Sequence, residues 1–313
     1  MRLSFATCAA AALIALAAPA YAGDKEACKK VRFSDVGWTD ITATTAVASQ
    51  LLTGLGYEPK TDLLSVPVTY ASLQNKQVDV FHGNWMPTME ADIKPFLADK
   101  SVEVVGVNLT GAKYTLAVPT YLYDAGLKSF NDIKKFKDKL GAKIYGIEPG
   151  NDGNRLILDM IKEDKFGLKE FELVESSEQG MLAQVERVSA KNEPVVFLGW
   201  EPHPMNTKYK LSYLSDGDDI FGADFGGATV STNVRAGLAA ECPNLGALLK
   251  NLVFSLDMEN KIMGAILFDS VEGDKAASAW LKANPAPLEA WLKGVTTFDG
   301  KPGLEAVKKN LGM

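Results

Sequence analysis

The chain has 313 residues, 47% of them hydrophobic and 23% charged, and its 33 Lys and Arg against 39 Asp and Glu give a formal net charge of −6. An acidic chain without a basic patch argues against a nucleic-acid-binding protein. The excess of acidic over basic residues also disfavours an anionic ligand and permits a cationic one. The length is enough for two domains.

The first 22 residues have the layout of a secretory signal peptide. A positive charge at Arg2 is followed by an Ala- and Leu-rich apolar run, and residues 20–22 (AYA) form a small-residue cleavage site. The apolar run is shorter than the roughly 20 residues that span a bilayer. We therefore expect residues 1–22 to be removed by cleavage near Ala22 and the remainder to be exported.

Cleavage would leave Cys28 and Cys242 as the cysteines of the exported chain. In an oxidising compartment two such residues favour one disulfide, and two free buried thiols are the alternative. The sequence has neither a C-x-x-C pair nor the Cys and His spacing of a metal site. It therefore predicts no redox chemistry, no bound metal and no cofactor.

Strand and helix patterns alternate along the chain. In the first part we expect strands at 30–36, 63–68 and 78–83, helices at 39–57 and 69–77, and extended segments at 103–109 and 114–120. In the middle we expect helices at 129–140, 151–164 and 178–192 and strands at 143–149, 171–177 and 194–200. From about residue 240 the pattern is mainly helical. Such alternation predicts parallel sheets covered by helices, arranged in two α/β lobes.

Three tryptophans follow a glycine at the point where an apolar run ends: Trp38, Trp85 and Trp200. A glycine at a strand end lets the backbone turn and lets another group come close, and ligands bind outside the carboxyl ends of parallel strands. One such tryptophan is usually a packing residue. Three on strands that open into one cleft predict a ligand site lined by aromatic rings.

A bulky cation without hydrogen-bond donors suits several aromatic faces. The methyl groups of a quaternary ammonium block close approach of carboxylates, whereas aromatic rings offer apolar contact and a negative π-face. Asp40, two residues after Trp38 at the start of the first long helix, could balance the charge of such a ligand. Capping of that helix is the alternative role for Asp40.

Four segments resemble the substrate-binding proteins of ABC importers for choline and glycine betaine, most specifically the periplasmic choline-binding ones. The segments are FSDVGWTD (33–40), VDVFHGNWMPT (78–88), GIEPGNDGNRLI (146–157) and VVFLGWEPHPMN (195–206). The resemblance implies a type II periplasmic binding protein fold, with two lobes, each a mostly parallel sheet flanked by helices, and the ligand between them. We expect lobe I to comprise residues 23–110 and 216–313, and lobe II residues 111–215.

The same resemblance implies the residues of the site. Trp38, Trp85 and Trp200 would form three walls of an aromatic box, and Tyr114, which no pattern in the residues singles out, would form the fourth. Asp40 and Asn151 would contact the polar end of the ligand. Asn151 opens a predicted helix, so N-capping is the alternative for it.

The residues favour choline over glycine betaine. Asp40 would accept a hydrogen bond from the choline hydroxyl and would repel the carboxylate of betaine. The helix N-terminus at 151–154 could still hold a carboxylate, so betaine remains the alternative ligand. The expected function is capture of choline, and more weakly of acetylcholine, by a periplasmic monomer that delivers it to an inner-membrane ABC permease.

An enzyme is the rival class. The chain has two histidines, His82 and His203, without a metal-binding spacing. It has neither a G-x-S-x-G elbow nor a G-x-G-x-x-G loop. We therefore expect a binding protein without catalytic residues.

Overall fold

One continuous sheet organises the computed structural model, which describes residues 24–313. The predicted signal peptide, residues 1–22, lies outside the described residues and stays a prediction. Nine strands within 24–313 form the sheet, in the order β2-β1-β3-β9-β4-β7-β5-β6, with β8 paired to β4. The strands are β1 (Lys30–Asp35), β2 (Glu58–Leu63), β3 (Val80–Met86), β4 (Val102–Pro119), β5 (Lys143–Tyr145), β6 (Glu172–Val174), β7 (Phe197–Glu201), β8 (Leu211–Tyr213) and β9 (Gly227–Arg235).

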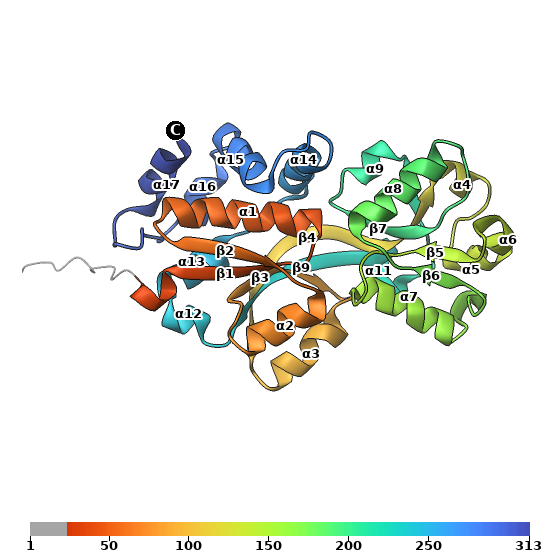
Figure 1. Ribbon diagram of the computed structural model, residues 1–313, viewed down its shortest axis with the longest axis horizontal. Helices are drawn as coiled ribbons and strands as arrows, with labels where there is room; N and C mark the ends of the chain where they lie inside the picture. Colours follow the sequence, from red (N-terminus) through yellow and green to blue (C-terminus); the bar gives the residue numbers. More distant parts are fainter. Residues whose placement is uncertain (1–23) are drawn as a thin grey trace, which may run out of the picture.

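The sheet is parallel at both ends and antiparallel in the middle. β1 pairs in parallel with β2 and β3, and β5 pairs in parallel with β6 and β7. β4 and β9 pair antiparallel with each other and connect the two ends. The result is two α/β halves bridged by two long strands (Figure 1). The predicted α/β class is confirmed, but the antiparallel centre was not predicted.

Helices cover both faces of the sheet in each half (Figure 1). The first half contains α1 (Thr39–Gly54), α2 (Val66–Gln74), α3 (Glu90–Ala98), α12 (Leu238–Glu241), α13 (Pro243–Asn251), α14 (Leu256–Leu267), α15 (Gly273–Ala283), α16 (Pro287–Trp291) and α17 (Gly303–Leu311). The second half contains α4 (Thr120–Asp124), α5 (Phe130–Ile133), α6 (Lys137–Leu140), α7 (Asp152–Lys162), α8 (Glu178–Ser189), α9 (Met205–Lys208), α10 (Asp218–Phe221) and α11 (Ala223–Gly226).

The bridging strands differ from the sequence-based prediction. The two predicted extended segments, 103–109 and 114–120, form one 18-residue strand, β4. β9 was missed because three consecutive buried positions, Ser231, Thr232 and Asn233, are polar and interrupt its apolar pattern. Two of these side chains have partners on neighbouring elements: Asn233 donates to Tyr70 Oη of α2 at 3.1 Å, and Thr232 accepts from Asn108 of β4 at 2.9 Å. Hydrogen bonding thus compensates the burial of polar groups that hide the strand in the sequence.

The predicted strand at 63–68 is wrong. β2 ends at Leu63, and α2 begins at Val66 with Pro67 in its first turn. Proline is accepted there because the first backbone N–H groups of a helix have no partner within the helix.

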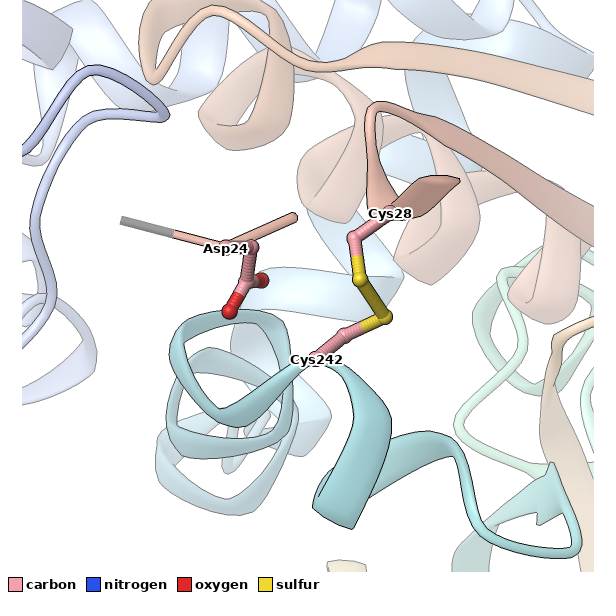
Figure 2. A group of neighbouring side chains, drawn as sticks. All are labelled: Asp24, Cys28 and Cys242. Atoms are coloured by element: carbon pink, nitrogen blue, oxygen red, sulfur yellow. A yellow bond between two sulfur atoms is a disulfide. The ribbon is translucent and has the colours of Figure 1, made fainter. Parts of the chain in front are cut away.

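A disulfide joins the start of the described chain to the segment before α13. Cys28 and Cys242 are bonded, so the predicted pairing is present (Figure 2). The carboxylate of Asp24 accepts hydrogen bonds from the backbone N–H groups of Asn244 and Leu245 at 2.8 and 2.9 Å. The carboxylate of Asp24 lies close to the sulfur atoms of Cys28 and Cys242. Both sulfur atoms are used in the disulfide, and both carboxylate oxygens accept hydrogen bonds that cap α13.

Residues 216–226 pack on the second half of the molecule. The ring of Phe221 lies 5.9 Å from Tyr114 and 5.9 Å from Phe130, and Asn131 donates to Asp216 at 3.1 Å. The chain therefore returns to the first half within β9. Among residues 24–313, the helices all fall short of the length and apolar character that crossing a membrane requires.

Candidate ligand-binding site

A cavity lies where the two halves meet. About 260 Å³ between its walls is not occupied by atoms, a volume that includes space open to solvent. Its walls are Trp38, Asp40, Trp85, Tyr114, Ile147, Asn151, Asp152 and Trp200. All six residues predicted as ligand contacts line it, together with two that were not predicted. Every one of the eight side chains is buried, so a ligand inside would be removed from water.

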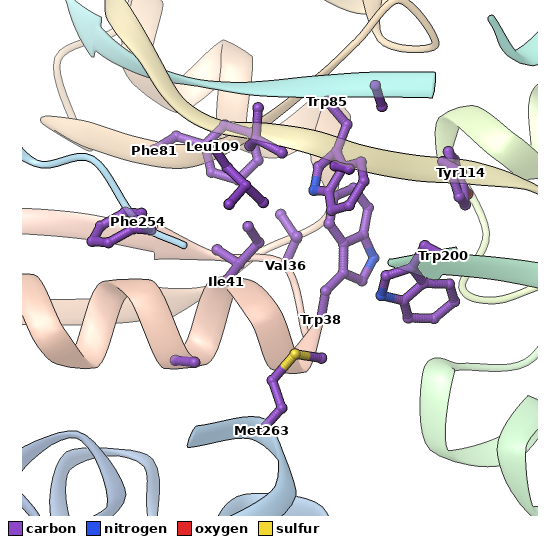
Figure 3. Close-up of a cluster of buried hydrophobic side chains, with 14 of the residues drawn as sticks. Val36, Trp38, Ile41, Phe81, Trp85, Leu109, Tyr114, Trp200, Phe254 and Met263 are labelled. Atoms are coloured by element: carbon purple, nitrogen blue, oxygen red, sulfur yellow. The ribbon is translucent and has the colours of Figure 1, made fainter. Parts of the chain in front are cut away.

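Four aromatic rings from both halves bound the cavity. Tyr114 lies between two tryptophans, with ring centroids 6.0 Å from Trp85 and 6.3 Å from Trp200, at interplanar angles of 59° and 81°. Trp38 completes the set from the junction of β1 and α1 (Figure 3). Rings at such angles present faces and edges around one space, which is the arrangement that holds a quaternary ammonium group.

Strand pairing fixes two of these walls. Tyr114 in β4 stands opposite Trp200 in β7, so their side chains share one face of the sheet. Trp85 stands opposite Val230 in the pairing of β3 with β9. The register of the bridging strands therefore determines how the box is shaped.

The predicted turn is present at Gly37, and the predicted close approach of another group is present at Gly83 and Gly199. Gly37 has φ +84° and turns the chain before Trp38. Gly83 and Gly199 lie inside strands, so the prediction that the strands end there is wrong. A Cβ at Gly83 would lie 2.8 Å from the ring of Phe81, and one at Gly199 would lie 2.8 Å from Cβ of Ala117. These two glycines are needed for close packing behind the tryptophans.

Asp40 keeps one carboxylate oxygen for the cavity. It is the second residue of α1, whose N-cap is Trp38. Its Oδ2 accepts a hydrogen bond from Trp85 Nε1 at 3.1 Å, while its Oδ1 is buried without a partner. Burial, followed by the nearby charge of Glu178, raises the pKa of Asp40 to about 8. A ligand that brings a positive charge and a hydroxyl donor would satisfy this oxygen.

Asn151 caps α7, the alternative role considered for it, and its contact with the ligand stays a prediction. Its Oδ1 caps α7 by accepting from the backbone N–H of Asn154 at 3.0 Å, and it also accepts from Tyr114 Oη at 2.9 Å. Its Nδ2 donates to Asp152 Oδ1 at 3.1 Å. Capping therefore orients Asn151 and, through it, the tyrosine wall.

Asp152 adds a second carboxylate that sequence reasoning missed. It is fully buried, its Oδ2 has no partner, and burial raises its pKa to about 6. Its position next to Asn151 in the GNDGN segment was the available signal. The lining contains two carboxylates and no Lys or Arg. The nearby Arg155 is held instead by Asp92 at 2.8 Å and by the carbonyl of Thr88 at 3.0 Å, so the cavity is electrostatically suited to a cation.

Comparison with known proteins identifies the family. The family model for the substrate binding domain of ABC-type glycine betaine transport systems matches residues 29–283. The chain belongs to this family. It is therefore the substrate-binding protein of a transport system and not an enzyme, and substrate-binding proteins of this family act in the periplasm or outside the cell.

Three solved structures describe the relationship further. An ABC-transporter choline binding protein in complex with choline is 64% identical, with 92% of this chain and all of that chain covered and a TM-score of 0.91. The ABC-transporter choline binding protein in an unliganded semi-closed conformation gives the same identity and coverage but a TM-score of 0.85. Lactococcal OpuAC in its closed-liganded conformation with glycine betaine is 28% identical, with 85% of this chain and all of that chain covered and a TM-score of 0.77. The fold is thus that of a type II periplasmic binding protein, and the present conformation is closer to the liganded than to the semi-closed state.

Proposed function

We propose that this protein captures choline in the periplasm and delivers it to an inner-membrane ABC permease. The observation that carries the proposal is the cavity itself, with four aromatic walls, an unpartnered oxygen of Asp40 and no cationic side chain. The 64% identity to a choline-binding protein supports the same ligand.

The aromatic walls account for a useful affinity. A desolvated cation–π contact contributes about 2 kcal/mol, so four rings contribute on the order of 8 kcal/mol, which corresponds to roughly micromolar binding. The entropy cost of association reduces this sum, and the hydrogen bond to Asp40 offsets part of the reduction.

The arrangement of polar groups ranks the ligands. Choline donates its hydroxyl to Asp40 and satisfies the buried oxygen. Acetylcholine lacks that donor and is larger, so we expect it to bind more weakly. Glycine betaine would bring a carboxylate instead of a hydroxyl toward Asp40 and Asp152, and that carboxylate would repel either aspartate in its ionised form.

Two lobes that close on the ligand complete the proposal. Lobe I would comprise residues 24–110 together with the part of the chain that follows the return to the first half within β9 (Gly227–Arg235). Lobe II would comprise the chain from residue 111 to that return. This modifies the predicted boundary at residue 216, because residues 216–226 contact Tyr114 and Phe130 of lobe II. We expect the working unit to be a monomer, since the cavity is built from one chain.

Titration calorimetry with choline, acetylcholine and glycine betaine tests the proposal. The expected result is one choline per chain, with acetylcholine weaker and betaine weakest. Betaine binding more tightly than choline would replace the proposal with an osmoprotectant-binding protein. Absence of binding by all three would reject the cage. Light scattering with and without choline tests the monomer.

A further inference from the structure

A carboxylate from the second half contacts the start of α1 in the first half. Glu178, the first residue of α8, accepts a hydrogen bond from the backbone N–H of Thr39 at 2.8 Å and another from its hydroxyl. Thr39 is the first residue of α1. The side chain of Glu178 is completely buried there.

This contact supplies a helix cap that the first half lacks. The first N–H groups of a helix have no partner within it, and a side chain at the N-cap normally satisfies one of them. The N-cap of α1 is Trp38, which makes no side-chain cap bond. Glu178 therefore takes that place from the other half of the molecule, and its negative charge is favourable at the positive end of α1.

His203 holds Glu178 in position. The backbone N–H of Met205 donates to His203 Nδ1 at 3.0 Å. Nδ1 is thus the acceptor nitrogen, and Nε2, 3.2 Å from Glu178 Oε1, is the nitrogen that donates. The ring of His203 also packs edge-on against Trp200, with centroids 4.9 Å apart.

The contacts connect walls of the cavity that come from different halves. Trp200 touches His203, His203 holds Glu178, and Glu178 binds Thr39, which lies between Trp38 and Asp40 in the chain. None of the three middle residues lines the cavity. This series of contacts can therefore form whenever the two halves approach each other, whatever ligand is inside the cavity.

We propose that Glu178, oriented by His203, is a positioning residue that latches the closed state by capping α1 from the opposite lobe. We call Thr39, Glu178 and His203 the closure latch. This inference rests on the proposed function, since it assigns the latch to the closing that captures the ligand. The latch raises the population of the binding-competent state, and apparent affinity falls in proportion when that population falls.

Loss of the latch and loss of a direct ligand contact have different expected effects on ligand preference. Loss of a direct contact changes the preference between ligands, because each ligand uses the contact differently. Loss of the latch lowers the fraction of closed protein before any ligand arrives, so it weakens every ligand by the same factor.

The test compares Glu178→Gln with Glu186→Gln. Glu186 lies on the same helix, α8, is exposed and forms an ion pair with Lys208 in the same half, so the control makes the same chemical change away from the cleft. Calorimetry should show choline and acetylcholine both weakened at least tenfold in Glu178→Gln, with their affinity ratio unchanged. Small-angle scattering of the ligand-free variant should give a larger radius of gyration than wild type. Glu186→Gln should match wild type in both measurements.

Thr39→Val gives a second variant that leaves the buried carboxylate in place. It removes the hydroxyl donor while keeping the backbone N–H, so we expect a smaller loss of affinity than in Glu178→Gln. In the double variant the two losses of affinity should not add. Unchanged affinity in both variants, or additive effects, would overturn the latch. A changed ratio between the ligands would instead make Glu178 a ligand contact and also overturn it.

The latch and the proposed function can fail separately. If wild type binds none of the ligands, the proposed function fails, and the ligand-free scattering still decides the latch. An equal radius of gyration for wild type and Glu178→Gln would then reject it, and a larger one for the variant would support it.

Discussion

Replacing Trp200 by leucine removes one aromatic wall while leaving an apolar side chain in β7. The ring is buried and borders the cavity beside Tyr114. A desolvated cation–π contact is worth about 2 kcal/mol, which corresponds to a roughly 30-fold loss of choline affinity. Trp200→Phe keeps a smaller π-face, so its loss should be only a few-fold. Calorimetric titration of choline into both variants measures the series.

The matched control is Trp280→Leu. Trp280 packs against Trp291 with ring centroids 6.5 Å apart and lies outside the cavity lining. This variant should lower the melting temperature and leave choline affinity unchanged. If Trp200→Leu folds and binds choline within about threefold of wild type, a 30-fold estimate per ring is refuted and the cage is not what binds the cation.

Three further predictions concern charge, pH and the disulfide. Asp40→Asn should weaken choline binding and lower the ratio of choline affinity to glycine betaine affinity, which competition calorimetry measures. An unchanged affinity ratio would contradict the role of the carboxylate. Because burial raises the pKa of Asp40 from 3.8 to about 8, the folded ligand-free protein binds this proton more tightly than the unfolded chain does, and the stabilisation this gives decreases as the pH rises from about 4 to about 8. Choline favours the ionised form, so its affinity should rise with pH from about 6 to 9, by at most about tenfold per unit, and the rise near pH 8 should vanish in Asp40→Asn. Replacing Cys28 and Cys242 by serine should lower the free energy of unfolding by about 2–5 kcal/mol without altering choline affinity, and equal urea midpoints for the two proteins would argue against a stabilising bond.

The sequence was most informative where aromatic and acidic residues gather in short segments. Trp38, Trp85 and Trp200 were found from their position after apolar runs, and they line one cavity. Tyr114 came only from the family resemblance, because a tyrosine in a strand is common. Its role depends on the register that places it opposite Trp200, and register cannot be obtained from a local pattern.

The features that sequence reasoning missed depend on contacts between distant segments. β9 buries Ser231, Thr232 and Asn233, so its apolar pattern is weak, and the partners of Thr232 and Asn233 lie on other elements, β4 and α2. Glu178 gains its role from Thr39, 139 residues away. The close approach expected at the glycines is present at Gly83 and Gly199, but the neighbours there, Phe81 and Ala117, and the continuation of both strands past the glycines were not predicted.

A crystal structure of the protein grown with choline tests the central claim most directly. The account predicts the trimethylammonium group within about 6 Å of all four ring centroids, and the choline hydroxyl at hydrogen-bond distance, about 2.7 Å, from Asp40 Oδ1. Choline bound outside the aromatic box, or with its hydroxyl directed away from Asp40, would contradict the account.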